Sequence, residues 1–235
     1  MTLPLSTSGD RRRGGWGGGK VYRGGVRSSR ASTRLSRATG PRYAGRRFDV
    51  VAIGSSAGGL QALTKVLAPL TADFPASILI VQHLDPHHKS MMSDLLSHKT
   101  RLRVKQAEHG EVLLPGVAYI APPDGHLLAG PGKVQLAHSQ LVHYSRPSID
   151  LLFESVAGTY GSRSIAVVLS GSNRDGSAGI RAVKEAGGTT IAQEPGSAEF
   201  EVMPSAAIRT GTIDLVLDLQ DIGPTLVELC TGKLP

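Results

Sequence analysis

The strongest constraint on the fold is an apolar segment that runs into a turn rich in glycine and serine, and then into an amphipathic helix. Residues 49–53 are mostly apolar and β-branched, which suits a short strand buried on both faces. After the turn, apolar residues recur at helical spacing: Leu60, Leu63, Val66, Leu67 and Leu70. The pattern predicts a strand, a tight turn and a helix in that order.

The turn itself, Gly54-Ser55-Ser56-Ala57-Gly58, fits the G-x-S-x-G pattern of a nucleophilic serine. A serine there lies at the carboxyl end of a strand and the positive end of a helix, where backbone N–H groups stabilise a developing oxyanion. The turn alone leaves two alternatives open. It also suits a loop that binds a phosphate, or a plain connection between strand and helix.

The alternation of strand and helix continues along the chain. Further strands are predicted at 75–82, 104–107, 117–121, 164–169, 189–192 and 214–217, with a hairpin over 127–137. One helix is predicted at about 88–96, and a second opens at 145 with Pro147 in its first turn. A third follows the polar segment 170–179 and ends at 185, and a fourth covers about 222–230. This order predicts an α/β fold: a single doubly wound, mostly parallel sheet with helices on both faces, in three layers.

The charge is divided unevenly between the start of the chain and the rest. Residues 1–47 hold twelve basic residues and one acidic residue, a net +11, whereas the remainder holds fourteen basic and eighteen acidic residues, a net −4. We predict a disordered tail rich in Arg, Gly and Ser over 1–46, and one folded domain over 47–235. The composition of the tail is compatible with binding to nucleic acid or to an anionic membrane, or with a targeting peptide. We favour a solvated extension, or a start site placed upstream of the true one.

Several classes of protein are disfavoured by composition. Cys230 is the one cysteine, so no disulfide framework or thiolate metal site forms within one chain. No apolar run approaches the roughly 20 residues of a membrane span. The histidines at 87, 88, 98 and 109 lack a ligand pattern, and the glycines lack a phosphate fingerprint. We therefore expect a cytoplasmic protein with no metal, no cofactor, no specific nucleic-acid partner and no membrane insertion.

Three of the predicted strands deliver a distinctive polar residue at or just beyond their carboxyl ends: Ser56, His83 and Asp175. Ligands bind at that edge of an open parallel sheet. A hydroxyl nucleophile needs a base, and the base needs a carboxylate, which these residues supply. An α/β-hydrolase places its histidine after its acid, and no histidine follows Asp175, so the order argues against that superfamily.

Six blocks in the same order resemble the catalytic domain of the CheB family, the protein-glutamate methylesterases of bacterial chemotaxis. They are residues 53–59 (IGSSAGG), 81–83 (VQH), 118–126 (AYIAPPDGH), 146–153 (RPSIDLLF), 169–176 (LSGSNRDG) and 202–204 (VMP). The resemblance covers about 48–230. For two residues of the third block, Asp124 and His126, we favour a structural role over a position lining the substrate groove.

The resemblance implies a role for each site residue. Ser56 is the nucleophile, His83 the general base and acid, and Asp175 the orienting carboxylate, while Ser55 is not catalytic. The backbone N–H groups of Ala57 and Ser172 hold the oxyanion. The implied reaction is a carboxylic ester hydrolysis, that of glutamyl methyl esters on the cytoplasmic helices of chemoreceptors. Some members also deamidate glutamine.

Two rivals to this function remain open: an esterase of the same mechanism on another ester, and a non-catalytic signalling module. The chemotaxis enzymes usually carry a receiver domain before the esterase. Residues 1–47 are too short and too basic to form one. We therefore expect an esterase that lacks its own phosphorylation switch and depends on a separate partner for any regulation.

Overall fold

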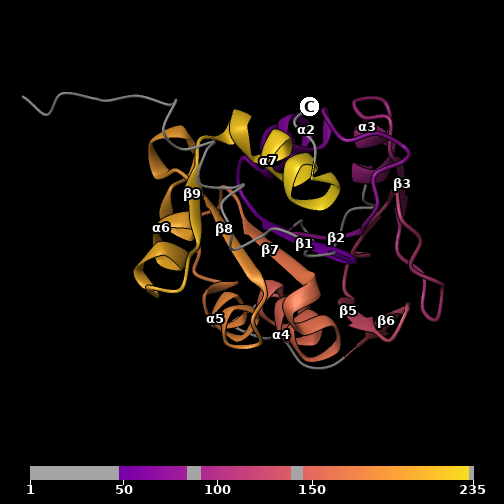
Figure 1. The fold of residues 1–235 in the computed structure, drawn as a ribbon. Coiled ribbons are helices and arrows are strands. Elements are labelled where there is room, and N and C mark those ends of the chain that lie inside the picture. The colour runs from indigo at the N-terminus through magenta and orange to yellow at the C-terminus, as the bar shows by residue number, and fades with distance from the viewer. Residues whose placement is uncertain (1–47, 84–90, 139–144, 233–235) are drawn as a thin grey trace, which may run out of the picture. The chain divides into compact units, whose positions relative to one another are not determined.

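A computed structural model describes residues 48–83, 91–138 and 145–232 (Figure 1). Its main sheet has seven strands: β1 (Val50–Ser55), β2 (Ser77–Gln82), β3 (Arg103–Gln106), β4 (Val117–Ile120), β7 (Ser164–Val168), β8 (Thr189–Gln193) and β9 (Leu215–Leu217). Their order is β3-β4-β2-β1-β7-β8-β9, and each neighbouring pair is parallel. A separate antiparallel hairpin consists of β5 (His126–Gly130) and β6 (Lys133–Ala137). The predicted parallel sheet and hairpin are confirmed.

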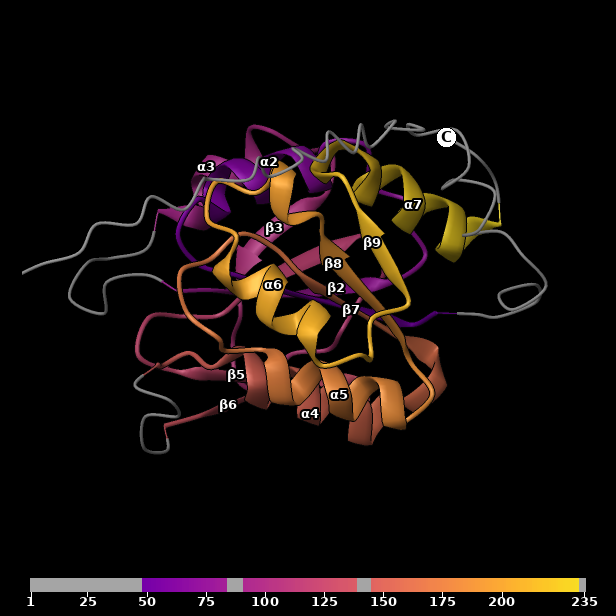
Figure 2. The same cartoon turned by 90° about the vertical axis from the view of Figure 1, so that its left-hand side faces the viewer.

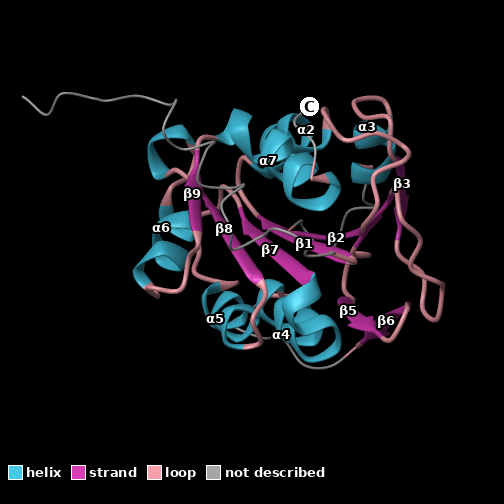
Figure 3. Cartoon of the chain, viewed as in Figure 1, coloured by secondary structure: helices cyan, strands magenta, loops and turns pink. Residues whose placement is uncertain are grey.

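Helices cover both faces of the sheet, as Figure 1 and the turned view of Figure 2 show. One face carries α2 (Gly59–Leu67), α3 (Met92–Ser97) and α7 (Leu219–Thr231). The other carries α4 (Ile149–Tyr160), α5 (Ser177–Glu185) and α6 (Val202–Arg209), together with the hairpin. Two 3₁₀ turns, Gly161–Arg163 and Pro195–Ser197, complete the elements. The three predicted layers are visible in Figure 3, with the magenta strands between the cyan helices.

The sequence of β1 explains why both faces are covered. Successive side chains of a strand point to opposite faces. Val51 and Ile53 pack into the core under α2 and α7. Val50 and Ala52 pack into the core under α4 and α5. All four are nearly inaccessible to solvent, so the strand is apolar throughout rather than alternating, as expected for a buried parallel strand.

The order of the strands reverses at β1, because the chain adds strands first on one side of β1 and then on the other. This reversal determines where the site lies. β2 lies on one side of β1 with Ser55 opposite Gln82, and β7 lies on the other with Gly54 opposite Val168. Because the strands are parallel, their carboxyl ends share one edge of the sheet. This edge, where strand order reverses, is where ligands bind in open α/β sheets.

Several elements differ from the prediction: α6 was not predicted, α7 begins at Leu219 rather than at 222, and two other helices begin later than expected. The helix expected at about 88–96 begins at Met92, and residues 84–90 lie outside the described part of the chain. Pro147 does not lie in the first turn of α4 but precedes the helix, because Ser148 is the N-cap and accepts from the Leu151 N–H. Such a side-chain acceptor satisfies a helix N–H that has no partner within the helix.

The predicted tail, residues 1–46, lies outside the described residues, so its disorder and the domain boundary at 47 stay predictions. Among the helices that the structure describes, none combines the length and apolar character needed to cross a membrane.

Candidate active site

The three predicted catalytic residues follow three adjacent strands of the sheet. Ser56 follows β1, His83 follows β2, and Asp175 lies in the loop between β7 and α5. Nε2 of His83 lies 2.9 Å from Oδ2 of Asp175. The Asp175 side chain is 1% exposed and that of His83 14%, so this contact is shielded from water. The structure therefore brings the predicted acid and base into direct contact.

Ser56 is half-buried on the turn after β1, and its backbone N–H donates to the carbonyl of Ser170 at 2.9 Å. Within the described residues, no hydrogen bond joins its hydroxyl to His83. The second imidazole nitrogen, Nδ1, instead lies 3.1 Å from the side-chain nitrogen of Asn173. Catalytic hydrogen bonds are often long in the absence of substrate and tighten only when substrate binds.

Asp175 is held by the first turn of α4 as well as by His83. Its Oδ2 accepts from the N–H of Ile149 at 2.8 Å, and its Oδ1 accepts from the N–H of Asp150 at 2.9 Å. Burial alone would raise the pKa of Asp175, but the hydrogen bonds from His83 and from these two N–H groups hold it below its ordinary value. The carboxylate is therefore ionised, positions the imidazole and caps α4 from a distant loop.

A second buried carboxyl group, that of Asp150, lies beside Asp175. Its Oδ1 accepts from the N–H of Gly179 at 2.7 Å. Burial, and then the neighbouring charge of Asp175, raise the pKa of Asp150 to about 6. The two carboxyl groups thus differ in charge state over the mildly acidic range, with the proton on Asp150.

This arrangement predicts a pH-dependent stability difference between the wild type and Asp150→Asn. Because the folded-state pKa of Asp150 is raised, its contribution to stability is complete below its ordinary value of 3.8 and is lost as pH rises through about 6. Asparagine does not titrate. The free energy of unfolding of Asp150→Asn, relative to wild type, is expected to rise by about 2–3 kcal/mol between pH 4 and 7. Urea unfolding at several pH values measures it, and a constant difference would contradict the account.

A buried polar network holds the turn that carries Ser56. Ser55 is fully buried, and its hydroxyl donates to Oε1 of Gln82 at 2.6 Å. The Gln82 amide nitrogen donates to the carbonyls of Ser56 at 2.7 Å and His83 at 2.9 Å. Gln82 thereby ties the turn that carries Ser56 to the neighbouring strand. Sequence reasoning missed it, and the available signal was an amide side chain at the end of an apolar strand, directly before His83.

Gly59 leaves room for this network, which predicts an unusual substitution effect. A Cβ at Gly59 would lie 1.8 Å from Oε1 of Gln82 and 2.9 Å from the Ser55 hydroxyl. Alanine normally stabilises a helix relative to glycine. Here Gly59→Ala is expected to destabilise the fold by about 1–3 kcal/mol, because the crowded side chains have to move.

Gly158→Ala is the matched control, because Gly158 is exposed on α4 and a Cβ there meets no atom within 4 Å. This variant is expected to gain up to about 1 kcal/mol. Urea unfolding of the two variants beside wild type makes the comparison. A stabilised Gly59→Ala would contradict the packing around the turn.

The two predicted oxyanion donors are available in the structure. Among the hydrogen bonds of the described residues, neither the N–H of Ala57 nor that of Ser172 donates to another protein group. The carbonyl of Ala57 accepts from the Ser170 hydroxyl at 2.8 Å, and Ser170 also receives the N–H of Phe200 at 3.0 Å. The loops after β1 and β7 are therefore held together beside Ser56. The assignment of these two N–H groups stays a prediction.

Of the other polar residues singled out in the sequence, His126 reaches the site through Ser148, whose hydroxyl donates to Oδ1 of Asp175 at 3.2 Å. His126 is fully buried, and its Nδ1 accepts from the N–H of Ser148 at 3.1 Å. Asp124 is exposed and pairs with Arg146. His98 and His109 are exposed, whereas 87 and 88 lie outside the described residues. The described part of the chain contains no group of three His, Cys, Asp or Glu placed to hold a metal ion.

The fold and this cluster define a class: a doubly wound α/β domain with serine, histidine and aspartate at three adjacent strand ends. A family model described as CheB methylesterase matches residues 51–226. The chain belongs to the CheB methylesterase family.

Individual relatives agree with this assignment. A protein-glutamate methylesterase/protein-glutamine glutaminase of Moorella thermoacetica is 42% identical over 198 residues, which cover 81% of this chain and 47% of that protein. A putative enzyme of the same name from Leptospira interrogans is 36% identical over 188 residues, 80% of this chain and 97% of that protein. The crystal structure of the Thermotoga maritima CheB methylesterase catalytic domain matches with a TM-score of 0.74 and 39% identity, covering 77% of this chain and 98% of that one.

The chain spans about half the length of the first of these relatives and nearly all of the second. The matched crystal structure is a catalytic domain, and it is covered almost completely. The shared region is therefore the methylesterase domain.

Proposed function

We propose that this chain is a cytoplasmic protein-glutamate methylesterase that hydrolyses glutamyl methyl esters on the cytoplasmic helices of chemoreceptors. The observation that carries the proposal is the contact between His83 and Asp175 beside the turn of Ser56, in a chain of the CheB methylesterase family. The names of its relatives also include protein-glutamine glutaminase. Deamidation of glutamine uses the same acyl chemistry and is part of the proposal.

The proposed mechanism assigns a role to each site residue. Ser56 attacks the ester carbonyl while His83 takes its proton, and the N–H groups of Ala57 and Ser172 stabilise the oxyanion. His83 returns the proton to the departing methoxide, so methanol leaves and a glutamyl ester of Ser56 forms. Water, deprotonated by His83, then hydrolyses this ester and restores Ser56. Asp175 stays ionised throughout and stabilises the imidazolium.

The test is methanol release from a chemoreceptor cytoplasmic fragment carrying methyl groups labelled by its methyltransferase. The wild type is expected to release labelled methanol, and unmodified receptor fragment is the control for background. A parallel assay on a small activated acetyl ester measures the mechanism without the receptor.

The two assays together separate the rivals. Turnover of the small ester without release from the receptor would favour an esterase with another substrate. Inertness toward both would favour a non-catalytic signalling module. Dependence on a separate regulator would appear as release only after a chemotaxis partner is added, since a partner remains our expectation for any regulation.

A further inference from the structure

The loop between β7 and α5 contributes a third side chain to the catalytic cluster, that of Asn173. Its Oδ1 accepts from the backbone N–H of Asp175 at 3.1 Å, and its Nδ2 lies 3.1 Å from Nδ1 of His83. The other imidazole nitrogen, Nε2, lies 2.9 Å from the Asp175 carboxylate. The three residues therefore form a closed ring of hydrogen bonds.

The direction of each hydrogen bond in the ring is determined by chemistry. A backbone N–H only donates, so the Asn173 atom facing it is the carbonyl oxygen, and the amide nitrogen faces His83. That amide nitrogen only donates, so Nδ1 of His83 is the acceptor and carries no proton. The proton of the neutral imidazole is therefore on Nε2, from which it is donated to the ionised Asp175.

We propose that Asn173 is a positioning residue whose carboxamide donates to Nδ1 of His83 and thereby reserves that nitrogen for the proton of Ser56. In the ester complex the Ser56 hydroxyl replaces the amide at Nδ1. The proposal rests on the proposed function only in taking His83 as the base. Nothing in the ring depends on which ester is hydrolysed.

Asn173→Asp gives the sharpest test, because the side chain keeps its shape but becomes an acceptor. A carboxylate facing Nδ1 stabilises a proton there, so an imidazolium is held between two carboxylates and cannot accept from Ser56. Among the described residues, Asp175 is the titratable side chain in contact with His83. The carboxylate introduced by Asn173→Asp is therefore the second carboxylate beside the imidazole. With the small acetyl ester, kcat is expected to fall at least about fiftyfold at pH 7 and to recover partly at higher pH.

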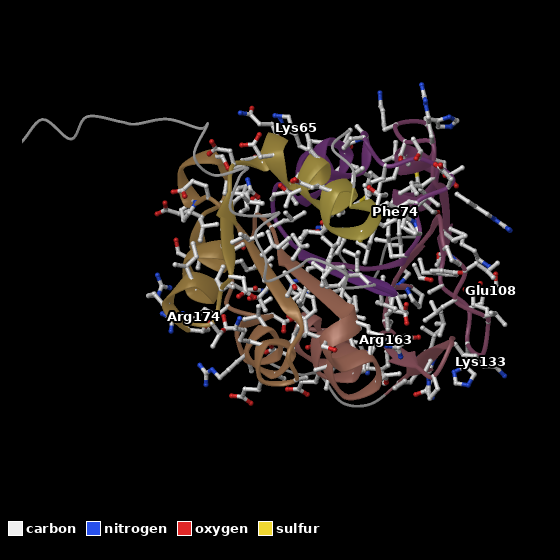
Figure 4. The ribbon with its side chains drawn as sticks, viewed as in Figure 1. Lys65, Phe74, Glu108, Lys133, Arg163 and Arg174 are labelled. Carbon is white, nitrogen blue, oxygen red and sulfur yellow. The ribbon has the colours of Figure 1, made fainter. Side chains whose placement is uncertain are left out.

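Two further variants separate donation from simple packing. Asn173→Ala removes the donor without adding a charge, and is expected to lower kcat about five- to tenfold with little change in KM and no shift of the pH profile. Arg174→Ala is the control, because Arg174 is the next residue of the loop and is exposed (labelled in Figure 4). It is expected to retain wild-type turnover.

The readout independent of activity is the ¹⁵N spectrum of the His83 imidazole, assigned by comparison with His83→Gln. The wild type is expected to show a neutral ring protonated on Nε2, and Asn173→Asp a proton on Nδ1 as well. A wild-type ring protonated on Nδ1 would overturn the proposal, as would an Asn173→Asp variant with wild-type kcat at pH 7. If the receptor assay fails but these results hold, only the proposed substrate is wrong.

Discussion

Ser56→Ala is expected to abolish ester hydrolysis, with kcat reduced by a factor on the order of 10⁴ or more. In the proposed mechanism the hydroxyl oxygen of Ser56 forms the covalent bond to the acyl group, and the variant has no oxygen at this position. Initial rates with the small acetyl ester, measured by stopped flow at saturating substrate, give the comparison. The fold is expected to be unaffected, because within the described residues the Ser56 hydroxyl makes no hydrogen bond.

Ser55→Ala is the matched control for this prediction. Ser55 is adjacent to Ser56 in sequence, but its hydroxyl is buried and donates to Gln82 at 2.6 Å. Removing it leaves Oε1 of Gln82 without this donor and is expected to cost about 1–2 kcal/mol of stability. Turnover is expected to stay within about tenfold of wild type, since only positioning is affected. A larger loss in Ser55→Ala than in Ser56→Ala would reverse the assignment of the nucleophile.

Asp175→Asn is expected to have two large and separable effects. Turnover falls by a factor on the order of 10³–10⁴, because an amide cannot stabilise the imidazolium and can donate toward Nε2. Stability falls by about 1–3 kcal/mol, because an amide nitrogen then faces the N–H of Ile149 or of Asp150 at the start of α4. Steady-state kinetics and urea unfolding measure the two effects on the same preparation.

Asp49→Asn is the control, because Asp49 lies just before β1, at the opposite end from the site, where it pairs with the exposed Arg163 (labelled in Figure 4). It is expected to cost under about 1 kcal/mol and to leave turnover unchanged. An Asp175→Asn variant that lost activity but kept full stability would contradict its role as the cap of α4.

The fold was largely predictable because its signals are local. Most buried strands are short apolar runs followed by a turn and a helix, whereas β4 is followed by the hairpin, so the three layers follow largely from the order of elements. The prediction placed Pro147 inside α4, whereas Ser148 caps the helix. The error arose because a proline suits the first turn, but the side chain after it is the better hydrogen-bond acceptor.

The same reasoning selected Ser56, His83 and Asp175, because each comes at or shortly after the carboxyl end of a strand, and the structure places His83 against Asp175. It missed what holds them. Gln82 is far from Ser55 in sequence, and Asp175 is 26 residues from the Ile149 N–H that it accepts. Such contacts arise when separate βα units pack together, so no local pattern predicts them. These hydrogen bonds can be identified only once the strands and helices are packed together at this edge of the sheet.

The central claim is that Ser56 carries the acyl group during turnover. Its direct test is rapid acid quenching of the protein during hydrolysis of the small acetyl ester, followed by peptide mapping in a mass spectrometer. The account predicts one acetyl group, on Ser56, that forms faster than steady-state turnover and is absent from Ser56→Ala. An acetyl group on another residue, or hydrolysis that continues in Ser56→Ala without any covalent adduct, would contradict it.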